Sequence, residues 1–207
     1  MQALIYWTKV KPLTEEQEMQ WIQNLPAEKQ QRICNMKDPM RRAASLTAEQ
    51  LLALGLRQYG VDAEKTERTL TPQGKPMFAK GGIHFSLSHS GEFALAAVAK
   101  IPIGADIQLC RPAEYPALAA RMFTPEEVTY MQNASDMQRA FYRIWVCKES
   151  MGKCFGSGLH SGLPTVLKDG KIADNFVVAE EEDLCIGAYA DASLQWQIKY
   201  IKSSEIG

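Results

Sequence analysis

Hydrophobic residues along the chain follow two different repeats, and each repeat predicts its own kind of element. Short apolar runs bounded by turn-forming residues predict strands at the N-terminus and again from Gly82 onward. Apolar residues spaced three or four apart predict helices, the longest of them over residues 41–59 and 137–155. The predicted strands are residues 3–7, 83–88, 93–100 and 103–107, followed by the segments FVVA, LCIGAYA and LQWQIKYI.

Capping residues mark where the helices begin and end. Thr14 and Thr124 each open a four-residue stretch that fits a capping box, in which side chains bond the free amides of the first turn. Pro26 can open a further helix, and Gly60 and Gly156 follow the two long ones. Each half of the chain therefore offers helices followed by strands, which permits an internal duplication.

One segment shows neither the strand pattern nor the helical spacing of apolar residues. TLTPQGKPMF, which begins at Thr69, is punctuated by prolines and a glycine, so we expect a polar loop there.

Composition and charge narrow the class of protein. Of the 207 residues, 46% are hydrophobic and 23% are charged, which is enough for a core in one domain or in two small halves. The formal net charge of −1 argues against a protein that coats nucleic acid, so an anionic ligand would need a local cluster of cations. Five cysteines without a CxxC pair indicate free thiols in a reducing compartment. No signal peptide and no membrane span is expected, which predicts a soluble, cytoplasmic protein.

Two polar segments could hold a phosphate and a cation. In SLSHSG, hydroxyls, an imidazole and a glycine amide meet at one turn and can surround a phosphate, although a hairpin whose serines bond its own backbone explains the segment equally well. In the apolar strand IPIGADI, alternation places Asp106 and Gln108 on one face. An acid in such a run costs free energy unless it is paired or binds a metal, and a strand ending at an exposed aspartate is the ordinary alternative.

A third segment is the helix FYRIWVCKESMGKCF. Trp145, Glu149 and Lys153 lie four residues apart and form one stripe, with Lys148 beside Glu149. A surface Glu–Lys pair worth about 0.3 kcal/mol is the ordinary explanation. However, the many aromatic and sulfur-bearing residues indicate a largely buried helix, and it runs into the glycine-rich turn GSGL. A carboxylate and two lysines on such a helix suit a metal–diphosphate site.

In order and spacing, SLSHSG, GADIQ and FYRIWVCKESMGKCFGSGL resemble the three signature blocks of the 4'-phosphopantetheinyl transferases. The similarity is greatest to the larger, pseudo-dimeric type that activates peptide and polyketide synthases. The resemblance implies an α+β fold built as a pseudo-twofold pair of similar α/β halves, with the active-site cleft between them. Residues 1–103 would contact the nucleotide of coenzyme A, and residues 104–207 would carry the metal and the catalytic residues.

The resemblance also implies roles for single residues. Asp106, Glu149 and Lys153 would be catalytic, and Asp106 and Glu149 would bind the metal together with Gln108. Gln108 stands where many relatives have a second acid, so we expect weaker metal binding but no loss of activity. Contacts to coenzyme A are implied for Lys75, Ser88, His89, Lys148 and Lys153.

One implied contact has no direct match. The family's arginine that grips the 3'-phosphate would fall at Ala44, so the role passes to Arg41 or Arg42, about one helical turn earlier. We expect His84 and His160 to be structural.

The implied reaction transfers the 4'-phosphopantetheine group of coenzyme A to a serine of an apo acyl or peptidyl carrier protein, with Mg²⁺, or Mn²⁺ in its place, as the cofactor. The products are holo carrier protein and adenosine 3',5'-bisphosphate. Glu149 would accept the serine proton or act only as a metal ligand. Two alternatives are a coenzyme A-binding homologue without turnover and a magnesium-dependent hydrolase of phosphoanhydrides.

The implied partner is the carrier protein, and neither nucleic acid nor a membrane is expected. Tyr115, Leu118 and Met122 either dock the carrier or complete the core. Two halves in one chain complete the cleft without a second subunit, which favours a monomer.

Overall fold

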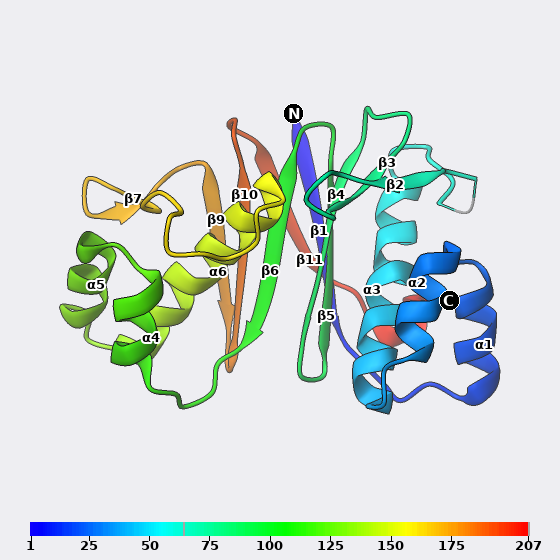
Figure 1. Cartoon of the computed structure of the whole chain (residues 1–207), viewed down its shortest axis with the longest axis horizontal. Coiled ribbons are helices and arrows are strands. Elements are labelled where there is room, and N and C mark those ends of the chain that lie inside the picture. Colours follow the sequence, from blue (N-terminus) through cyan, green and yellow to red (C-terminus); the bar gives the residue numbers. More distant parts are fainter. Residues whose placement is uncertain (64, 207) are drawn as a thin grey trace.

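A computed structural model describes residues 1–63 and 65–206, and its mixture of helices and sheets confirms the α+β class (Figure 1). Glu64 and Gly207, the last residue of the predicted second half, lie outside the described part. The helices are α1 (Glu15–Gln23), α2 (Ala27–Cys34), α3 (Pro39–Arg57), α4 (Tyr115–Met122), α5 (Pro125–Gln132) and α6 (Met137–Phe155). The strands are β1 (Gln2–Lys9), β2 (Arg68–Leu70), β3 (Pro76–Phe78), β4 (His84–Ser90), β5 (Phe93–Ala99), β6 (Ile103–Leu109), β7 (Leu167–Lys168), β8 (Lys171–Ile172), β9 (Phe176–Glu181), β10 (Leu184–Ala190) and β11 (Gln195–Tyr200).

The predicted caps begin and end the helices as expected. Thr14 forms a capping box with Gln17 at the start of α1, and Thr124 forms one with Glu127 at the start of α5. Helix α6 ends at Gly156, whose φ of 75° is left-handed and therefore favours glycine. No helix in the described part of the chain is long and apolar enough to cross a membrane.

Two sheets form the centre of the molecule. One has the strand order β11-β1-β5-β4, and the other has the order β6-β10-β9. Strand β11 pairs in parallel with β1, so the last strand of the chain returns to the sheet of the first half. The predicted division at 103/104 therefore does not hold for residues 195–200, since they cover the edge of β1 that would otherwise be open.

Each sheet has a long helix on its outer face, α3 on one and α6 on the other (Figure 1). Between the sheets lies a core of small and branched side chains from β1, β5, β6 and β10, including Ile5, Leu95, Ile107 and Ile186. This arrangement places β4 next to β6, where the two halves meet. The pseudo-twofold relation between the halves stays a prediction.

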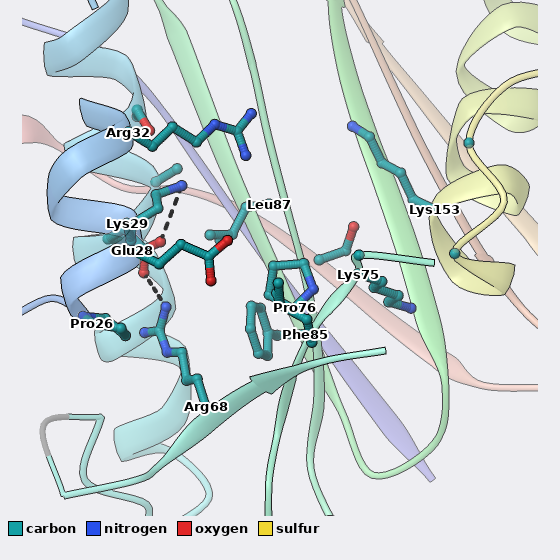
Figure 2. Close-up of a pocket in the computed structure, with 18 of the residues that line it drawn as sticks. Pro26, Glu28, Lys29, Arg32, Arg68, Lys75, Pro76, Phe85, Leu87 and Lys153 are labelled. Atoms are coloured by element: carbon teal, nitrogen blue, oxygen red, sulfur yellow. Dashed lines mark hydrogen bonds and ion pairs between the residues drawn. The ribbon is translucent and has the colours of Figure 1, made fainter. Parts of the chain in front are cut away.

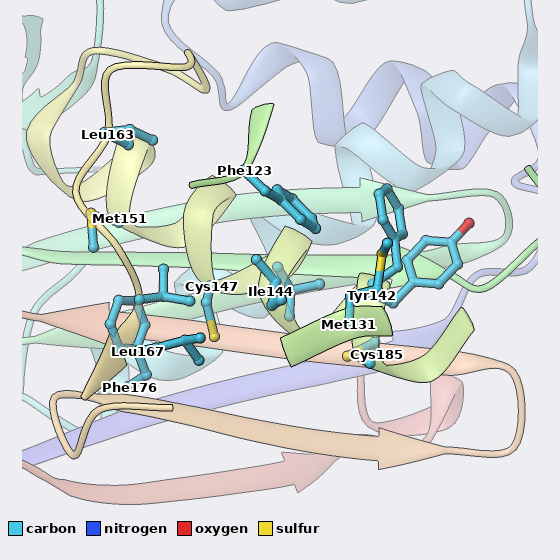
Figure 3. Close-up of a cluster of buried hydrophobic side chains, with 14 of the residues drawn as sticks. Phe123, Met131, Tyr142, Ile144, Cys147, Met151, Leu163, Leu167, Phe176 and Cys185 are labelled. Carbon is cyan, nitrogen blue, oxygen red and sulfur yellow. The ribbon is translucent and has the colours of Figure 1, made fainter. Parts of the chain in front are cut away.

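A second core lies around α6 (Figure 3). Ile144 and Cys147 on this helix pack among residues of α5, of β9 and β10, and of the loop after α6. Side chains of α4 close it from outside: Tyr115, Leu118 and Met122 pack against this cluster and are half-buried. These three residues thus contribute to the core and keep part of their surface exposed.

Helix α6 packs unusually close to its sheet because glycines face it. A Cβ atom at Gly104 would overlap the carbonyl oxygen of Ser150 and the amide nitrogen of Cys154. A Cβ at Gly187 would lie 2.7 Å from the side chain of Val146. Neither position has room for a side chain, so these glycines set the distance between α6 and strands β6 and β10.

The segment expected to be a polar loop forms a small hairpin instead. Arg68 pairs with Phe78 and Leu70 with Pro76, so β2 and β3 flank a tight turn at residues 71–75. Pro76 lies in this two-stranded ribbon, at a position that tolerates its missing N–H. The hairpin lies beside α3 and β4 and forms part of the cavity described below.

Candidate active site

Three serines of β4 join the two sheets. Ser86, Ser88 and Ser90 alternate along the strand and so lie on the same face, toward β6. The Ser86 hydroxyl accepts a hydrogen bond from the amide of Ala105 at 3.0 Å, and the Ser90 hydroxyl accepts one from the amide of Leu109 at 3.1 Å. The serines therefore bond across to the other half rather than to the backbone of their own hairpin.

Asp106 lies at this seam and is 2% exposed. Its Oδ1 accepts hydrogen bonds from Ser88 Oγ at 2.6 Å and from Lys153 Nζ at 2.5 Å. Its Oδ2 accepts a bond from Gln108 Nε2 at 2.9 Å. A buried carboxylate needs such partners, and the ammonium group also offsets its charge.

Two residues of the predicted stripe on α6, Glu149 and Lys153, interact with this carboxylate, whereas Trp145 packs against Phe123 and Phe141. Trp145, Glu149 and Lys153 are partly exposed, whereas residues 146–148 and 150–152 are buried. Burial raises the pKa of Glu149, the charge of Asp106 raises it further, and Lys153 opposes both effects. The structure thus brings Asp106, Glu149 and Lys153 together from a strand and a helix of the same half.

The oxygen atoms at this point suit a hard cation. Asp106 and Glu149 offer carboxylates, the ligands that Mg²⁺ prefers together with water and phosphate oxygens. Gln108 turns its amide nitrogen to Asp106, and its oxygen accepts from Ser90 Oγ at 3.3 Å. Among residues 1–63 and 65–206, no group of three or more His, Cys, Asp or Glu side chains could hold a metal. A cation here would therefore rest on two carboxylates and on oxygens of its ligand.

A cavity of about 850 Å³ opens beside these residues and is lined from both halves (Figure 2). Arg32 and Lys153 extend into it from opposite sides. Six cationic side chains line it against two acidic ones, Glu28 and Glu49, so the cavity has an excess of four positive charges in a chain of net charge −1. This local field favours a polyanionic ligand. The six cations are Lys29, Arg32, Arg41, Arg68, Lys75 and Lys153.

The structure distinguishes between the two candidate arginines. Arg41 lines the cavity, whereas Arg42 does not. The Arg42 guanidinium instead lies 3.3 Å from a carboxylate oxygen of Glu18 and donates to the carbonyl of Met36 at 2.9 Å. Of the two, only Arg41 is placed to hold a phosphate of a ligand in this cavity.

His89 and Lys75 also line the cavity. Burial lowers the pKa of His89, and the nearby charge of Arg41 acts in the same direction. The Lys75 ammonium group donates to the carbonyls of Ile103 at 3.1 Å and of Cys154 at 2.9 Å, which ties the turn of the β2–β3 hairpin to the end of α6. Burial lowers the pKa of Lys75.

The two histidines expected to be structural lie elsewhere. His84 is half-buried at the start of β4, and the exposed His160 accepts a hydrogen bond from the amide of Gly162 at 3.1 Å.

The structure contradicts the predicted phosphate contact of Lys148. Its side chain is fully buried, with Nζ 3.0 Å from a carboxylate oxygen of Glu127, and it donates to the carbonyls of Leu163 and Pro164. One step along a helix turns a side chain by about 100°, so the neighbour of Glu149 points into the core instead of the cavity. Glu127 also accepts from the amide of Val166 at 2.8 Å, which completes a buried network.

Several cavity residues have no counterpart among the predicted site residues. Lys29 and Arg32 lie three apart on α2, and this spacing could have placed both on one face. Arg68 and Glu49 carried no such signal, because they meet only when the hairpin folds against α3.

Comparisons with known proteins show what the chain is similar to in sequence. A model of the 4'-phosphopantetheinyl transferase superfamily matches residues 102–196, which include β6 and α6. The 4'-phosphopantetheinyl transferase HetI of Nostoc sp. (strain PCC 7120) is 32% identical over 158 residues, 68% of this chain and 67% of that protein. A 4'-phosphopantetheinyl transferase of Bacillus subtilis is 30% identical over 153 residues, 72% of this chain and 68% of the relative. The 4'-phosphopantetheinyl transferase Sfp of Bacillus subtilis (strain 168) is 27% identical over 153 residues, which cover 72% of this chain and 68% of that protein.

Proposed function

Because the chain belongs to the 4'-phosphopantetheinyl transferase superfamily, we propose that Asp106, Glu149 and Lys153 carry its reaction at the seam between the halves. The enzyme transfers the phosphopantetheine group of coenzyme A to a carrier protein. The observation that supports these three residues is the 2.5 Å contact between Lys153 and the buried Asp106, beside a cavity with an excess of positive charge.

Coenzyme A would lie in the 850 Å³ cavity. Its 3'-phosphate end is proposed to contact Arg41 and His89, with Lys29 and Arg32 completing a cationic wall on α2. Its diphosphate would lie toward Lys153, on the opposite side of the cavity (Figure 2). Hydrogen bonds between cationic side chains and phosphate oxygens are among the stronger ones in proteins, so each cation would contribute measurably to affinity.

Asp106 and Glu149 are the residues that would hold Mg²⁺. Bound there, the cation would supply positive charge to the diphosphate oxygens. Lys153 would then divide its hydrogen bonds between Asp106 and a phosphate oxygen, because an ammonium group has three donors. A ligand role for Gln108 requires its amide oxygen to turn from Ser90 toward the cation.

The carrier serine would attack the β-phosphate of coenzyme A, and the bond from that phosphorus to the oxygen of the adenosine 3',5'-bisphosphate would break. Glu149 is proposed to accept the serine proton, which its raised pKa favours. Lys153 would donate to the leaving phosphate and offset its developing charge. The exposed parts of Tyr115, Leu118 and Met122 on α4 are proposed to contact the carrier. We propose that the enzyme acts as a monomer.

Intact-mass spectrometry of an apo carrier protein, incubated with the enzyme, coenzyme A and magnesium, tests this proposal. A mass gain of one phosphopantetheine group is expected. Release of adenosine 3',5'-bisphosphate from an unmodified carrier would instead indicate a hydrolase, and binding without turnover would indicate an inactive homologue.

Single variants test the residue roles. Asp106→Ala and Glu149→Gln should abolish transfer, and wild-type rates in either variant would overturn the assignment. Arg41→Gln should raise the KM for coenzyme A. Arg42→Gln is its matched control, since it removes a neighbouring cation that is paired with Glu18 outside the cavity.

A further inference from the structure

One acidic side chain lies in the wall of a cavity that is otherwise suited to an anion. Glu49 on α3 is 4% exposed and lines the cavity. Its Oε2 accepts a hydrogen bond from Arg68 Nη1 at 2.7 Å, and its Oε1 lies 3.5 Å from Lys29 Nζ. Figure 2 shows the two bonds, from Lys29 and from Arg68, converging at this wall. A carboxylate here repels a polyanion, so its presence needs a physical reason.

Glu49 connects three elements that are separate in the sequence. Lys29 belongs to α2, Glu49 to α3 and Arg68 to β2. The Arg68 guanidinium also lies 5.3 Å from the ring centre of Phe85 and 5.8 Å from that of Phe78. Arg68 is therefore fixed by the carboxylate and by the two rings.

Behind the pair lies a second, smaller cavity of about 170 Å³, which Glu49 and Arg68 also line. Glu49 and Arg68 therefore each border both cavities. Packing is incomplete where a side chain borders a cavity, so the ion pair contributes to holding Glu49 and Arg68 in place.

Without Glu49, the positive charges of Arg32 and Arg68 would repel Lys29. Burial lowers the pKa of Lys29, and the positive charges of Arg32 and Arg68 lower it too, whereas Glu49 acts in the opposite direction. The carboxylate therefore favours the charged form of Lys29 and holds this side chain close to Arg68.

We propose that Glu49 is a positioning residue that holds Lys29 and Arg68 ready for the phosphates of coenzyme A, so that removing its negative charge weakens coenzyme A binding instead of strengthening it. This inference rests on the proposed placement of coenzyme A in the cavity. It concerns affinity, because Lys29 and Arg68, the two cations that Glu49 holds, lie across the cavity from Lys153 (Figure 2).

The two acidic residues of the cavity, Glu28 and Glu49, provide a test. For Glu49, a pure charge effect and a positioning role predict opposite changes in the affinity for coenzyme A. Glu28 is exposed and reaches into the same cavity (Figure 2). By charge alone, Glu49→Gln and Glu28→Gln would both tighten coenzyme A binding. We expect Glu28→Gln to lower the Kd measured by calorimetry, and Glu49→Gln to raise the Kd and the KM about tenfold, the value of one charge-assisted hydrogen bond. The kcat at saturating coenzyme A should stay at the wild-type value. Tighter or unchanged binding by Glu49→Gln would overturn the proposal.

A double-mutant cycle separates positioning from a general structural effect. In a Lys29→Gln background, Glu49→Gln should cause much less further loss of affinity, because one of the cations it holds is already absent. A purely structural role would give the same loss in both backgrounds and would overturn the proposal. If Glu49→Gln does not fold, Glu49→Asp serves in the same cycle with the same two outcomes.

Arg41→Gln distinguishes this inference from the placement of coenzyme A. Wild-type affinity in Arg41→Gln would refute the placement itself. Weakened binding in Arg41→Gln, with normal binding in Glu49→Gln, would refute only the role of Glu49.

Discussion

Lys148→Met leaves the carboxylate of Glu127 uncompensated in a core where neither side chain is exposed. Removing one partner of a buried ion pair costs about 3–5 kcal/mol. Methionine keeps most of the lysine's volume, so the cavity it creates is small and adds little. The carbonyls of Leu163 and Pro164 also lose their donor, which moves the expected cost toward the upper end, about 4–5 kcal/mol.

Urea denaturation and thermal unfolding measure this loss. For a chain of this size, the expected cost lowers the Tm by roughly 10 °C. The Kd for coenzyme A of the folded variant should equal that of the wild type, because Lys148 does not line the cavity. Lys168→Met, at an exposed lysine of the same half, is the matched control and should leave the Tm unchanged. Adding Glu127→Gln should recover part of the stability, because it removes the stranded charge.

The opposite pattern would refute the buried placement. If Lys148→Met unfolds like the wild type but binds coenzyme A about tenfold more weakly, Lys148 contacts a phosphate and the sequence-based assignment was right.

Three further predictions concern the site and its support. In Gln108→Glu, a third carboxylate replaces the amide that donates to Asp106 at 2.9 Å, so magnesium should raise the Tm more than it does in the wild type. An equal rise, or a large loss of transfer, would contradict this. Coenzyme A should raise the lowered pKa of His89, so calorimetry in two buffers near pH 6 should detect more proton uptake by the wild type than by His89→Gln; equal uptake would contradict it. Because binding raises this pKa, the affinity for coenzyme A should rise as the pH falls toward the pKa of His89 in the free enzyme. Gly104→Ala should destabilise the fold by about 3 kcal/mol or more and reduce transfer, since the new methyl group overlaps the backbone of α6, and normal stability would contradict it.

Local sequence signals predicted those parts of the molecule that depend on local physics. The capping boxes at Thr14 and Thr124 are formed, because each involves residues only three apart. The stripe of Glu149 and Lys153 follows in the same way from the four-residue spacing on α6.

Long-range contacts were beyond such signals. Strand β11 pairs with β1 across nearly the whole chain, and Glu49 meets Arg68 only after the β2–β3 hairpin has folded against α3. Lys148 shows a different limit. A charged residue beside the proposed catalytic Glu149 favours a functional interpretation, but the burial of Lys148 depends on Glu127, which belongs to another helix.

The placement of the proposed catalytic groups depends on how closely two elements approach. Asp106 comes from β6, whereas Glu149 and Lys153 come from α6, and the absence of a side chain at Gly104 brings this helix against that strand. The serines of β4 then hold β6 from the other side. Ser86 bonds the backbone of β6, and Ser88 bonds the carboxylate of Asp106 on that strand. Strand β6 is therefore held from both sides, by contact with α6 and by hydrogen bonds from β4. It follows that the motifs SLSHSG and GADIQ form one structural unit, because their small residues position the carboxylate that Lys153 contacts. A substitution at Gly104, which does not line the cavity, should disturb the reaction without removing a contact to coenzyme A.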